Sequence, residues 1–354
     1  MEALDNRCDH DMPFLLRYEN VAWYENGKVR MLDRRCYPTE VRFAECSSYR
    51  EVAQAIADMV IQSTGPYTAV GMGMALAAYE ARDLPEAEQR QFLTQAANEL
   101  ANSRPTAAHR YGKVTGHCLN AALKALDEGR DTAQACFERT VESLNRRYST
   151  MQIVGDHLCD LIPDNGTILT QCYGETIIGT VTRAARRKGK EFKAICAETR
   201  PFFQGARLTS SCFAEMGIHT TVVSDNMIAW AMQTQGIDLF TSACDAMTKD
   251  GHIANKIGTL QISILCQHFG IPFYVTGLPD ASKASADDIV IEMRDPDQVL
   301  SARGIRNCRP EVHGLYPAFD IVPPNLITGM VTDKGVYLPQ MLHHYYDEAV
   351  TEYY

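Results

Sequence analysis

A cysteine and an aspartate in the second half of the chain each come shortly after a short apolar run. Cys172 follows the run Thr167–Thr170, and Asp245 follows the run Leu239–Ala243. Runs of this length and composition predict buried strands, and the carboxyl ends of parallel strands meet at one edge of a sheet, where α/β proteins bind their ligands. A thiol and a carboxyl group at that edge could move protons on a small substrate.

Cations and amides lie in loops that should reach the same edge. The strand-like run Phe192–Ala197 leads into a stretch that contains Arg200, Gln204, Gly205 and Arg207. Two arginines, a glutamine and a glycine suit an anionic ligand that carries hydroxyl groups. This loop is therefore a candidate for substrate binding.

A second candidate for anion binding lies farther along the chain. Apolar spacing predicts a helix over Ala254–Phe269, and Asn255 and Lys256 stand at its start, close to Gly258. A helix N-terminus with a lysine and nearby glycines is a natural phosphate site.

Each of these residues also has a structural interpretation. Cys172 alone would be a buried structural thiol, and Arg200 could pair with Glu198 at the surface. Asp225, just after the run Thr220–Ser224, would cap the start of a helix. The functional interpretation rests on the constellation, because the separate structural explanations would all have to hold together.

Strand-like runs that alternate with helical patterns organise the second half, residues 151–354. The five runs are Thr167–Thr170, Phe192–Ala197, Thr220–Ser224, Leu239–Ala243 and Pro272–Gly277. This alternation predicts an α/β domain with a doubly wound, mainly parallel sheet. No Gly-x-Gly-x-x-Gly follows the first run, so no dinucleotide cofactor is predicted.

Residues 1–150 form a separate predicted domain that is mostly helical with a small β lead-in. Asn26-Gly27 between two alternating runs is a strong hairpin signal. Apolar spacing predicts helices over Glu51–Ile61, Pro85–Leu100, Thr106–Leu126 and Phe137–Leu158.

Composition narrows the class of protein. The 354 residues suffice for two domains, and the net charge of −10 argues against broad binding to nucleic acid or to an anionic membrane. The chain has no run of about 18 apolar residues and no signal peptide, so we expect a cytoplasmic protein. Its 12 scattered cysteines show neither a Cys-x-x-Cys pair nor zinc spacing, which predicts buried free thiols and no metal site.

Several long motifs resemble those of the methylthioribose-1-phosphate isomerase family. They are Ser103–Ala107, Glu198–Thr209, Asp225–Met227, Ala254–Thr259, Gly270–Val275, Ile291–Pro296 and Pro317–Thr328. The likeness extends from about Tyr18 to Leu338 and is densest over residues 165–337. The broader superfamily includes ribose-1,5-bisphosphate isomerase and the regulatory subunits of translation initiation factor 2B.

The resemblance implies a fold and an activity. It implies a Rossmann-like C-terminal domain, a smaller and mostly helical N-terminal domain, and a homodimer. Family members isomerise an aldose 1-phosphate to a ketose 1-phosphate without a metal or a redox cofactor. The family's catalytic cysteine and aspartate match Cys172 and Asp245, and its contacts to the substrate match Gly65, Arg104, Gln204, Asn255 and Lys256.

Three loops depart from the family pattern. Gln62–Pro66 stands where the family has Arg-Gly-Ala-Pro, Tyr173-Gly174-Glu175 stands where it has Asn-x-Gly, and Ala243–Ala246 stands where it has Gly-Ala-Asp-Arg. Because the first loop lacks a cation, we expect it to meet the phosphate through backbone N–H groups. Changes gathered around the expected site suggest an altered substrate or a lost activity.

The family chemistry gives these residues roles. Asp245 would give a proton to the ring oxygen of the sugar, and Cys172 would carry a proton from C2 to C1 if a cation such as Lys256 lowers the pKa of its thiol. Direct hydride transfer from C2 to C1 is the alternative. The default substrate is 5-methylthioribose 1-phosphate, and 5-deoxyribose 1-phosphate and ribose 1,5-bisphosphate are alternatives. A further alternative is a regulatory protein that senses a sugar phosphate or nucleotide without catalysis.

Overall fold

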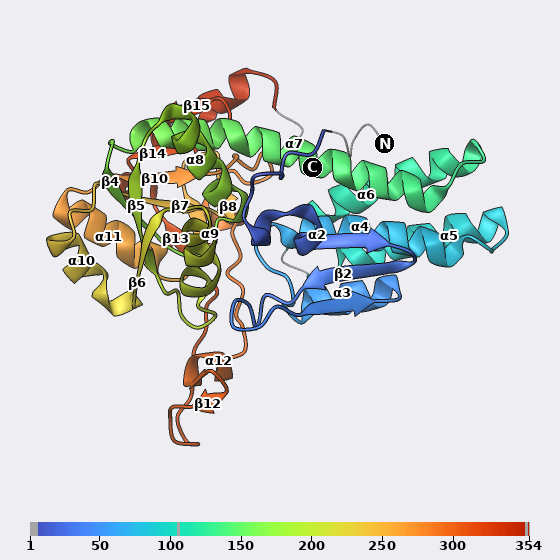
Figure 1. Cartoon of the computed structure of the whole chain (residues 1–354), viewed down its shortest axis with the longest axis horizontal. Coiled ribbons are helices and arrows are strands. Elements are labelled where there is room, and N and C mark those ends of the chain that lie inside the picture. Colours follow the sequence, from blue (N-terminus) through green and yellow to red (C-terminus); the bar gives the residue numbers. More distant parts are fainter. Residues whose placement is uncertain (1–5, 105–106, 351–352, 354) are drawn as a thin grey trace. The chain divides into compact units, whose positions relative to one another are not determined.

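The computed structural model describes residues 6–104, 107–350 and 353 of the chain (Figure 1). The chain divides into two compact units, of which the first ends at Thr150 and the second begins at Met151. Pro105 and Thr106, which belong to the motif Ser103–Ala107 and to the start of a predicted helix, lie outside the described residues. No helix in the described ranges is both long enough and apolar enough to cross a membrane.

The first unit contains a small antiparallel sheet of β1 (Ala22–Glu25), β2 (Lys28–Leu32) and β3 (Phe43–Cys46). Asn26 and Gly27 connect β1 to β2 with φ angles of 51° and 73°, the positive values that a two-residue hairpin turn requires. The hairpin predicted at this dipeptide is therefore present. A side chain at position 27 would also collide with the ring of Tyr79.

Helices form the rest of the first unit. They are η1 (Phe14–Leu16), α2 (Tyr18–Val21), α3 (Tyr49–Ala57), α4 (Gly65–Ala81), α5 (Glu86–Ala101), α6 (Ala108–Asp127) and the start of α7 (Thr132–Leu161). Helix α4 is apolar on all sides, and accordingly nearly all of its residues are buried. Gly71 lets α7 approach α4, because a Cβ at that position would lie 2.6 Å from the Thr140 hydroxyl.

A seven-stranded sheet forms the centre of the second unit. Its order is β15 (Gly335–Tyr337), β14 (Gly329–Thr332), β10 (Phe273–Thr276), β7 (Leu239–Ala243), β4 (Gly166–Thr170), β5 (Phe192–Ala197) and β6 (His219–Val223). Every neighbouring pair is parallel except β14 with β15, so each of the five predicted runs is a strand of a mostly parallel sheet. The chain order reverses at β4, between β5 and β7, and ligands of open α/β sheets bind at such a reversal.

Helices separate the strands of this sheet. They are α8 (Glu175–Lys188), η3 (Gly205–Thr209), α9 (Ser210–Glu215), η4 (Asp225–Met227), α10 (Ile228–Thr234), α11 (Thr259–Phe269), η5 (Ala286–Asp288), α12 (Asp297–Leu300), η6 (Pro324–Leu326) and η7 (Pro339–Asp347). Residues Leu169, Phe240, Phe273 and Met330 are fully buried in the core of the unit, and the rings of Phe240 and Phe273 stack with centroids 4.4 Å apart.

A smaller sheet corrects one prediction. Strands β8 (Ala246–Met247), β9 (Ile253–Lys256) and β13 (Phe319–Val322) pair antiparallel, and β11 (Ser301–Ala302) and β12 (Ile305–Arg306) form a separate hairpin. The helix predicted over Ala254–Phe269 therefore begins only at Thr259. Gly258, with a φ of 101°, breaks the chain between strand and helix, and apolar spacing alone cannot separate a four-residue strand from one helical turn.

Candidate active site

Cys172 and Asp245 come from two neighbouring strands of the large sheet. Strands β4 and β7 pair in parallel with Thr170 opposite Thr241, so the residues that follow them start from one sheet edge, about 4.8 Å apart laterally. The Cys172 thiol interacts electrostatically with Lys256 and with Asp245. The structure thus brings the Cys172 thiol together with a carboxyl group and an ammonium group that lie more than 70 residues farther along the sequence.

The backbone of Cys172 is held in an unusual conformation. Its φ of 62° is uncommon for a residue with a side chain and persists only where the surroundings fix it. The Cys172 N–H donates to Thr199 Oγ1 at 2.9 Å, and the hydroxyl of Thr209 donates to the Cys172 carbonyl. Two threonines from the segment after β5 therefore aim the thiol.

Asp225 fixes the threonine that holds Cys172. Its two carboxylate oxygens accept hydrogen bonds from the N–H groups of Thr199 at 2.9 Å and Arg200 at 2.7 Å. The predicted helix-capping role for Asp225 is wrong, because the residue that precedes η4 is Ser224. Asp225 instead clamps the loop that carries Thr199.

The charge state of Cys172 differs from the expectation. Burial raises the pKa of the thiol to about 11, and the nearby Lys256 ammonium only partly opposes this effect. The thiol is consequently protonated at neutral pH in the ligand-free protein, so the lowered pKa that the proton route requires of Cys172 is absent there. Desolvation raises the pKa of Cys172 by more than the Lys256 charge lowers it, because the thiol is buried.

Lys256 is a buried cation with an aromatic neighbour. It is 4% exposed, and its Nζ lies 4.3 Å from the centroid of the Phe319 ring, which stands opposite it in the β9–β13 ladder. Burial, and then the charge of Arg294, lower the pKa of Lys256 to about 8. Its ammonium can therefore change charge near neutrality.

Arg294 also belongs to this cluster, although no role was predicted for it from the sequence. Its Nε and Nη2 bind the two carboxylate oxygens of Glu292 at 2.9 and 3.2 Å, and its Cζ lies 5.5 Å from the Phe319 centroid. It interacts electrostatically with both Lys256 and Cys172. The spacing of Glu292 and Arg294 was the available signal, because residues two apart in an extended segment share a side.

A hydrogen-bond network joins the segments that carry Cys172 and Lys256. Asn255 Nδ2 donates to the Thr259 hydroxyl at 3.1 Å, and that hydroxyl lies 2.7 Å from Gln171 Oε1 and 2.6 Å from the Lys256 carbonyl. Gln171 Nε2 donates in turn to the Ile257 carbonyl at 2.8 Å. Asn255 therefore has a structural partner beside its predicted contact with substrate.

The arginines after β5 serve the protein backbone. Arg200 Nη2 donates to the carbonyls of Val299 at 2.9 Å and Ser301 at 3.0 Å, and Arg207 donates twice to the Phe202 carbonyl at 3.0 and 2.7 Å. Main-chain acceptors take up these donors, whereas Arg200 Nη1 is buried without a hydrogen-bond partner among the described residues. That these arginines suit an anionic ligand stays a prediction.

Gln204 lies where the same loop closes against β5. It is 4% exposed and precedes the π-helical turn Gly205–Thr209. A Cβ at Gly205 would lie 1.8 Å from the Ala197 carbonyl oxygen, so only glycine allows this close approach. The turn thereby fixes the position of Gln204, whose contact with substrate remains a prediction.

The N-terminus of α11 does not offer the phosphate site that we expected. Asp320 Oδ2 accepts hydrogen bonds from the N–H groups of Gly258 at 2.6 Å and Leu260 at 3.0 Å. This carboxylate comes from β13 and occupies the place at which an anion would bind.

Gly65 and Arg104 belong to the first unit. Gly65 begins α4, and its N–H donates to the Gln62 carbonyl at 3.2 Å, which also accepts from Arg34 Nη1 at 2.6 Å. This amide therefore already has an acceptor, although we expected the loop to offer free N–H groups. Arg104 is half-buried in the segment before α6. The contacts of both residues with substrate remain predictions.

The chain is similar in sequence to known proteins. The sequence matches the Initiation factor 2 subunit family over residues 65–339. It is 37% identical over 345 residues to a methylthioribose-1-phosphate isomerase of Desulforudis audaxviator, a match that covers 90% of this chain and 94% of that protein.

Two solved structures are also similar. One is 5-methylthioribose 1-phosphate isomerase from Pyrococcus horikoshii, with a TM-score of 0.77 and 28% identity over 94% of this chain and 97% of that one. The other is titled translation initiation factor eIF-2B, subunit delta, from A. fulgidus, with a TM-score of 0.78 and 30% identity over 90% and 96% of the two chains. The chain belongs to the methylthioribose-1-phosphate isomerase family.

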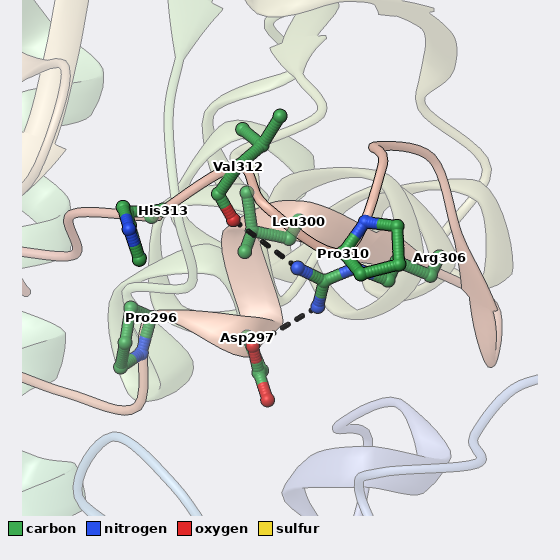
Figure 2. Close-up of a pocket in the computed structure, with 8 residues that line it drawn as sticks. Pro296, Asp297, Leu300, Arg306, Pro310, Val312 and His313 are labelled. Carbon is green, nitrogen blue, oxygen red and sulfur yellow. Dashed lines mark hydrogen bonds and ion pairs between the residues drawn. The ribbon is translucent and has the colours of Figure 1, made fainter.

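A surface hollow elsewhere in this family member takes no part in the cluster. It is lined by Pro296, Asp297, Leu300, Arg306, Pro310, Val312, His313 and Gly314. Figure 2 shows that Arg306, its cation, already reaches the Asp297 carboxylate and the Val312 carbonyl, each at 3.2 Å. None of the predicted catalytic or substrate-binding residues lines this hollow, so we do not assign the substrate to it.

Proposed function

We propose that this chain is an aldose–ketose isomerase that converts 5-methylthioribose 1-phosphate into 5-methylthioribulose 1-phosphate. One observation carries the proposal. In a chain of the methylthioribose-1-phosphate isomerase family, a thiol, a carboxyl group and an ammonium group interact at the carboxyl ends of two paired strands. Cys172 and Asp245 take the catalytic roles.

The first step opens the sugar ring. The phosphate on C1 keeps the ring closed, so no free aldehyde exists until the bond between C1 and the ring oxygen breaks. Asp245 donates a proton to that oxygen as the bond breaks, which leaves a hydroxyl group on C4 and an electron-poor C1. General acid catalysis of this kind contributes a rate factor of about 10² to 10⁴.

The second step moves a hydrogen from C2 to C1. In the proton route, the Cys172 thiolate removes the C2 proton to give an enol, and the thiol returns a proton to C1 while the C2 hydroxyl gives its own proton to a base, which leaves a ketone at C2. In the hydride route, the hydrogen moves with its electron pair from C2 to C1 while the C2 hydroxyl gives its proton to a base, which leaves a ketone at C2. The protonated state of Cys172 favours the hydride route, because that route needs no thiolate.

Substrate binding draws on the remaining predicted residues. We assign Lys256 and Arg104 to the phosphate, Gly65 to the loop that shapes the phosphate site, and Asn255 and Gln204 to the sugar hydroxyls. Lys256 is the best supported of these, because it is buried, charged near neutrality and close to Cys172. No cofactor enters the scheme.

An NMR assay tests the activity and the route together. The purified chain is incubated in D₂O with 5-methylthioribose 1-phosphate and, separately, in H₂O with the same compound deuterated at C2. The hydride route retains the C2 deuterium at C1 of the product, whereas the proton route exchanges it with solvent. Absence of any ketose 1-phosphate in either incubation would contradict the proposed function.

The altered loops favour one alternative within the same reaction. The segments 62–66, 173–175 and 243–246 all depart from the family pattern, so the group on C5 could differ. Parallel assays with 5-deoxyribose 1-phosphate and ribose 1,5-bisphosphate decide this by relative kcat/KM. Tight binding of such a compound without turnover would instead indicate the regulatory, non-catalytic alternative.

We also propose that the second unit acts as a Rossmann-like catalytic domain, the first as a smaller and mostly helical domain, and the whole as a cytoplasmic homodimer. Family membership supports this organisation. Size-exclusion chromatography with light scattering tests whether the chain is a dimer. A monomer at micromolar concentration would contradict the proposed dimer.

A further inference from the structure

Three buried hydrogen-bond donors near Cys172 have no acceptor among the described residues. Arg294 Nη1 and the Tyr316 hydroxyl are both shielded from solvent and make no hydrogen bond. The two groups lie side by side and interact, but not with the distance and angle of a hydrogen bond. In the described part of the chain, the Lys256 ammonium likewise has the Phe319 ring beside it but no acceptor oxygen.

The fold holds these donors together through three adjacent backbone segments. Arg294 N–H donates to the Tyr316 carbonyl at 2.9 Å, and the Ala318 N–H donates to the Glu292 carbonyl at 2.9 Å. Ile257 N–H donates to the Ala318 carbonyl at 3.1 Å, where β9 runs beside β13. The segment of Tyr316 thus lies between those of Arg294 and Lys256.

Orphaned donors of this kind call for an explanation. Buried polar groups in native proteins nearly always have a partner, and an unpaired buried cation is costly. Glu292 compensates only one side of the Arg294 guanidinium, through Nε and Nη2. The repulsion between Arg294 and Lys256 remains, and it contributes to the lowered pKa of Lys256. An anion beside these groups would relieve both costs.

Other positive groups near these strand ends are mostly bound by the protein itself. Arg207 and Arg200 Nη2 bind backbone carbonyls, and the N-terminus of α11 binds the Asp320 carboxylate. Arg200 Nη1 is buried without a hydrogen-bond partner among the described residues, but it stands alone, whereas Lys256, Arg294 and Tyr316 interact with one another and with Cys172. In sequence, the loop 62–66 lacks the arginine that the family pattern carries. The cluster of Lys256, Arg294 and Tyr316 therefore offers an anion several donors together, beside Cys172.

We infer that Arg294 and Tyr316 are phosphate-binding residues that act together with Lys256. The inference rests on the proposed function for the identity of the ligand, a phosphate monoester of a sugar. The outer nitrogen of Arg294, the Tyr316 hydroxyl and the Lys256 ammonium donate to phosphate oxygens. Glu292 holds the guanidinium from its opposite edge and orients it.

The test measures the affinity of the full-length chain for inorganic phosphate by isothermal titration calorimetry. Arg294→Gln should weaken binding about tenfold to hundredfold, the loss expected for one charge-assisted contact. Tyr316→Phe removes only one hydroxyl and should weaken binding by about threefold to tenfold. It serves as the second variant if Arg294→Gln does not fold, which the thermal midpoint reports.

Glu292→Gln is the matched control. It weakens the hydrogen bonds that orient the guanidinium but leaves the cation in place and removes a negative charge, so phosphate affinity should fall much less than in Arg294→Gln. Equal weakening in Glu292→Gln and Arg294→Gln would mean that the pair has only a structural role, and the inference would be wrong. Unchanged phosphate affinity in folded Arg294→Gln and Tyr316→Phe would also overturn it, even if kcat fell, since the donors would then serve another part of the substrate.

The outcome is separable from that of the proposed function. Phosphate affinity needs no turnover, so a chain that binds phosphate through Arg294 but isomerises none of the sugars tested would keep this inference and lose the proposed activity. A chain that isomerises its substrate with phosphate affinity independent of Arg294 would do the reverse.

Discussion

Two groups of positive charge in the second unit have opposite uses. The loop after β5 carries Arg200 and Arg207 in a motif that looks suited to an anion, yet both arginines donate to backbone carbonyls, and among the described residues Arg200 Nη1 is left without a partner. The cluster around Phe319 looks less conspicuous in sequence, yet its Lys256 and Arg294 retain donors without acceptors among the described residues. A cation marks a binding site only when the protein itself has not taken up its donors.

The largest expected effect tests whether catalysis takes place beside the second group of cations, at Cys172 and Asp245. Asp245→Asn should lower kcat by about 100-fold or more, the scale of general acid–base catalysis, and Cys172→Ser should do the same if the hydrogen moves as a proton through the thiol. Both side chains follow the ends of strands, so the thermal midpoint should move by only a few degrees. Steady-state kinetics with a thermal melt checks both statements, and near-full activity in Asp245→Asn would contradict the site assignment.

Next in size is the loss of the central cation. Lys256→Met keeps the length and the contact with Phe319 but removes the charge, so KM should rise about tenfold to hundredfold. The conservative variant Lys256→Arg should recover part of that loss. An unchanged KM in Lys256→Met would remove the contrast between the two groups of cations.

The pH dependence of phosphate binding sharpens the same contrast. The pKa of Lys256 is about 8, below its ordinary value of 10.5, so the folded chain loses this proton before the unfolded chain does. Phosphate affinity should therefore fall as the pH rises through about 8, by at most about tenfold for each further pH unit. Lys256→Met should show no such fall. By the same sign, the lowered pKa destabilises the fold below about pH 8, and the free energy of unfolding should rise with pH between about 8 and 10.5, where the unfolded chain binds more protons.

A smaller effect is expected where a residue acts through Cys172. Thr199→Val removes the oxygen that accepts from the Cys172 N–H, so kcat should fall by about tenfold, which corresponds to one lost hydrogen bond. KM should stay nearly constant because the phosphate contacts lie elsewhere. Thr199→Ser keeps the oxygen and should restore most of kcat; failure of serine to rescue would mean that packing, not the hydrogen bond, holds the thiol.

The smallest effect on catalysis is expected for a substitution in the loop after β5. Arg200→Gln loses hydrogen bonds to the Val299 and Ser301 carbonyls, so the thermal midpoint should drop by a few degrees. KM and phosphate affinity should stay within about twofold of the wild type, because no donor of the cluster is lost. A tenfold rise in KM would show that this arginine does meet the substrate.

Much of the sheet could be predicted because buried parallel strands have a plain pattern. Phe192–Ala197 and Leu239–Ala243 agree with the structure at both ends, since each is a short apolar run that is covered on both faces. Strand β9 could not be predicted, because Ile253–Lys256 reads equally well as the first turn of α11. Its pairing with β8 and β13 is a tertiary contact that no local pattern encodes.

The site was predicted in its residue types more than in its electrostatics. Strand order alone predicts that Cys172 and Asp245 meet at one edge of the sheet, whereas Lys256 was expected there at the start of a helix and lies on β9 instead. It could not show that burial would raise the pKa of the thiol, or that Asp320 would fill the N-terminus of α11. Both depend on which groups from distant segments surround a position, and the same holds for the carbonyls that bind Arg200.

The hydroxyl of Thr259 ties the thiol-bearing and lysine-bearing segments into one mechanical element. It contacts Gln171, next to Cys172, and the carbonyl of Lys256, and it accepts from Asn255. Thermal fluctuations of the two segments must therefore be correlated, since either can move freely only by breaking this junction. Much of the entropy that a substrate would otherwise have to remove is already lost when the chain folds, so a larger share of the binding free energy remains for discrimination between sugars.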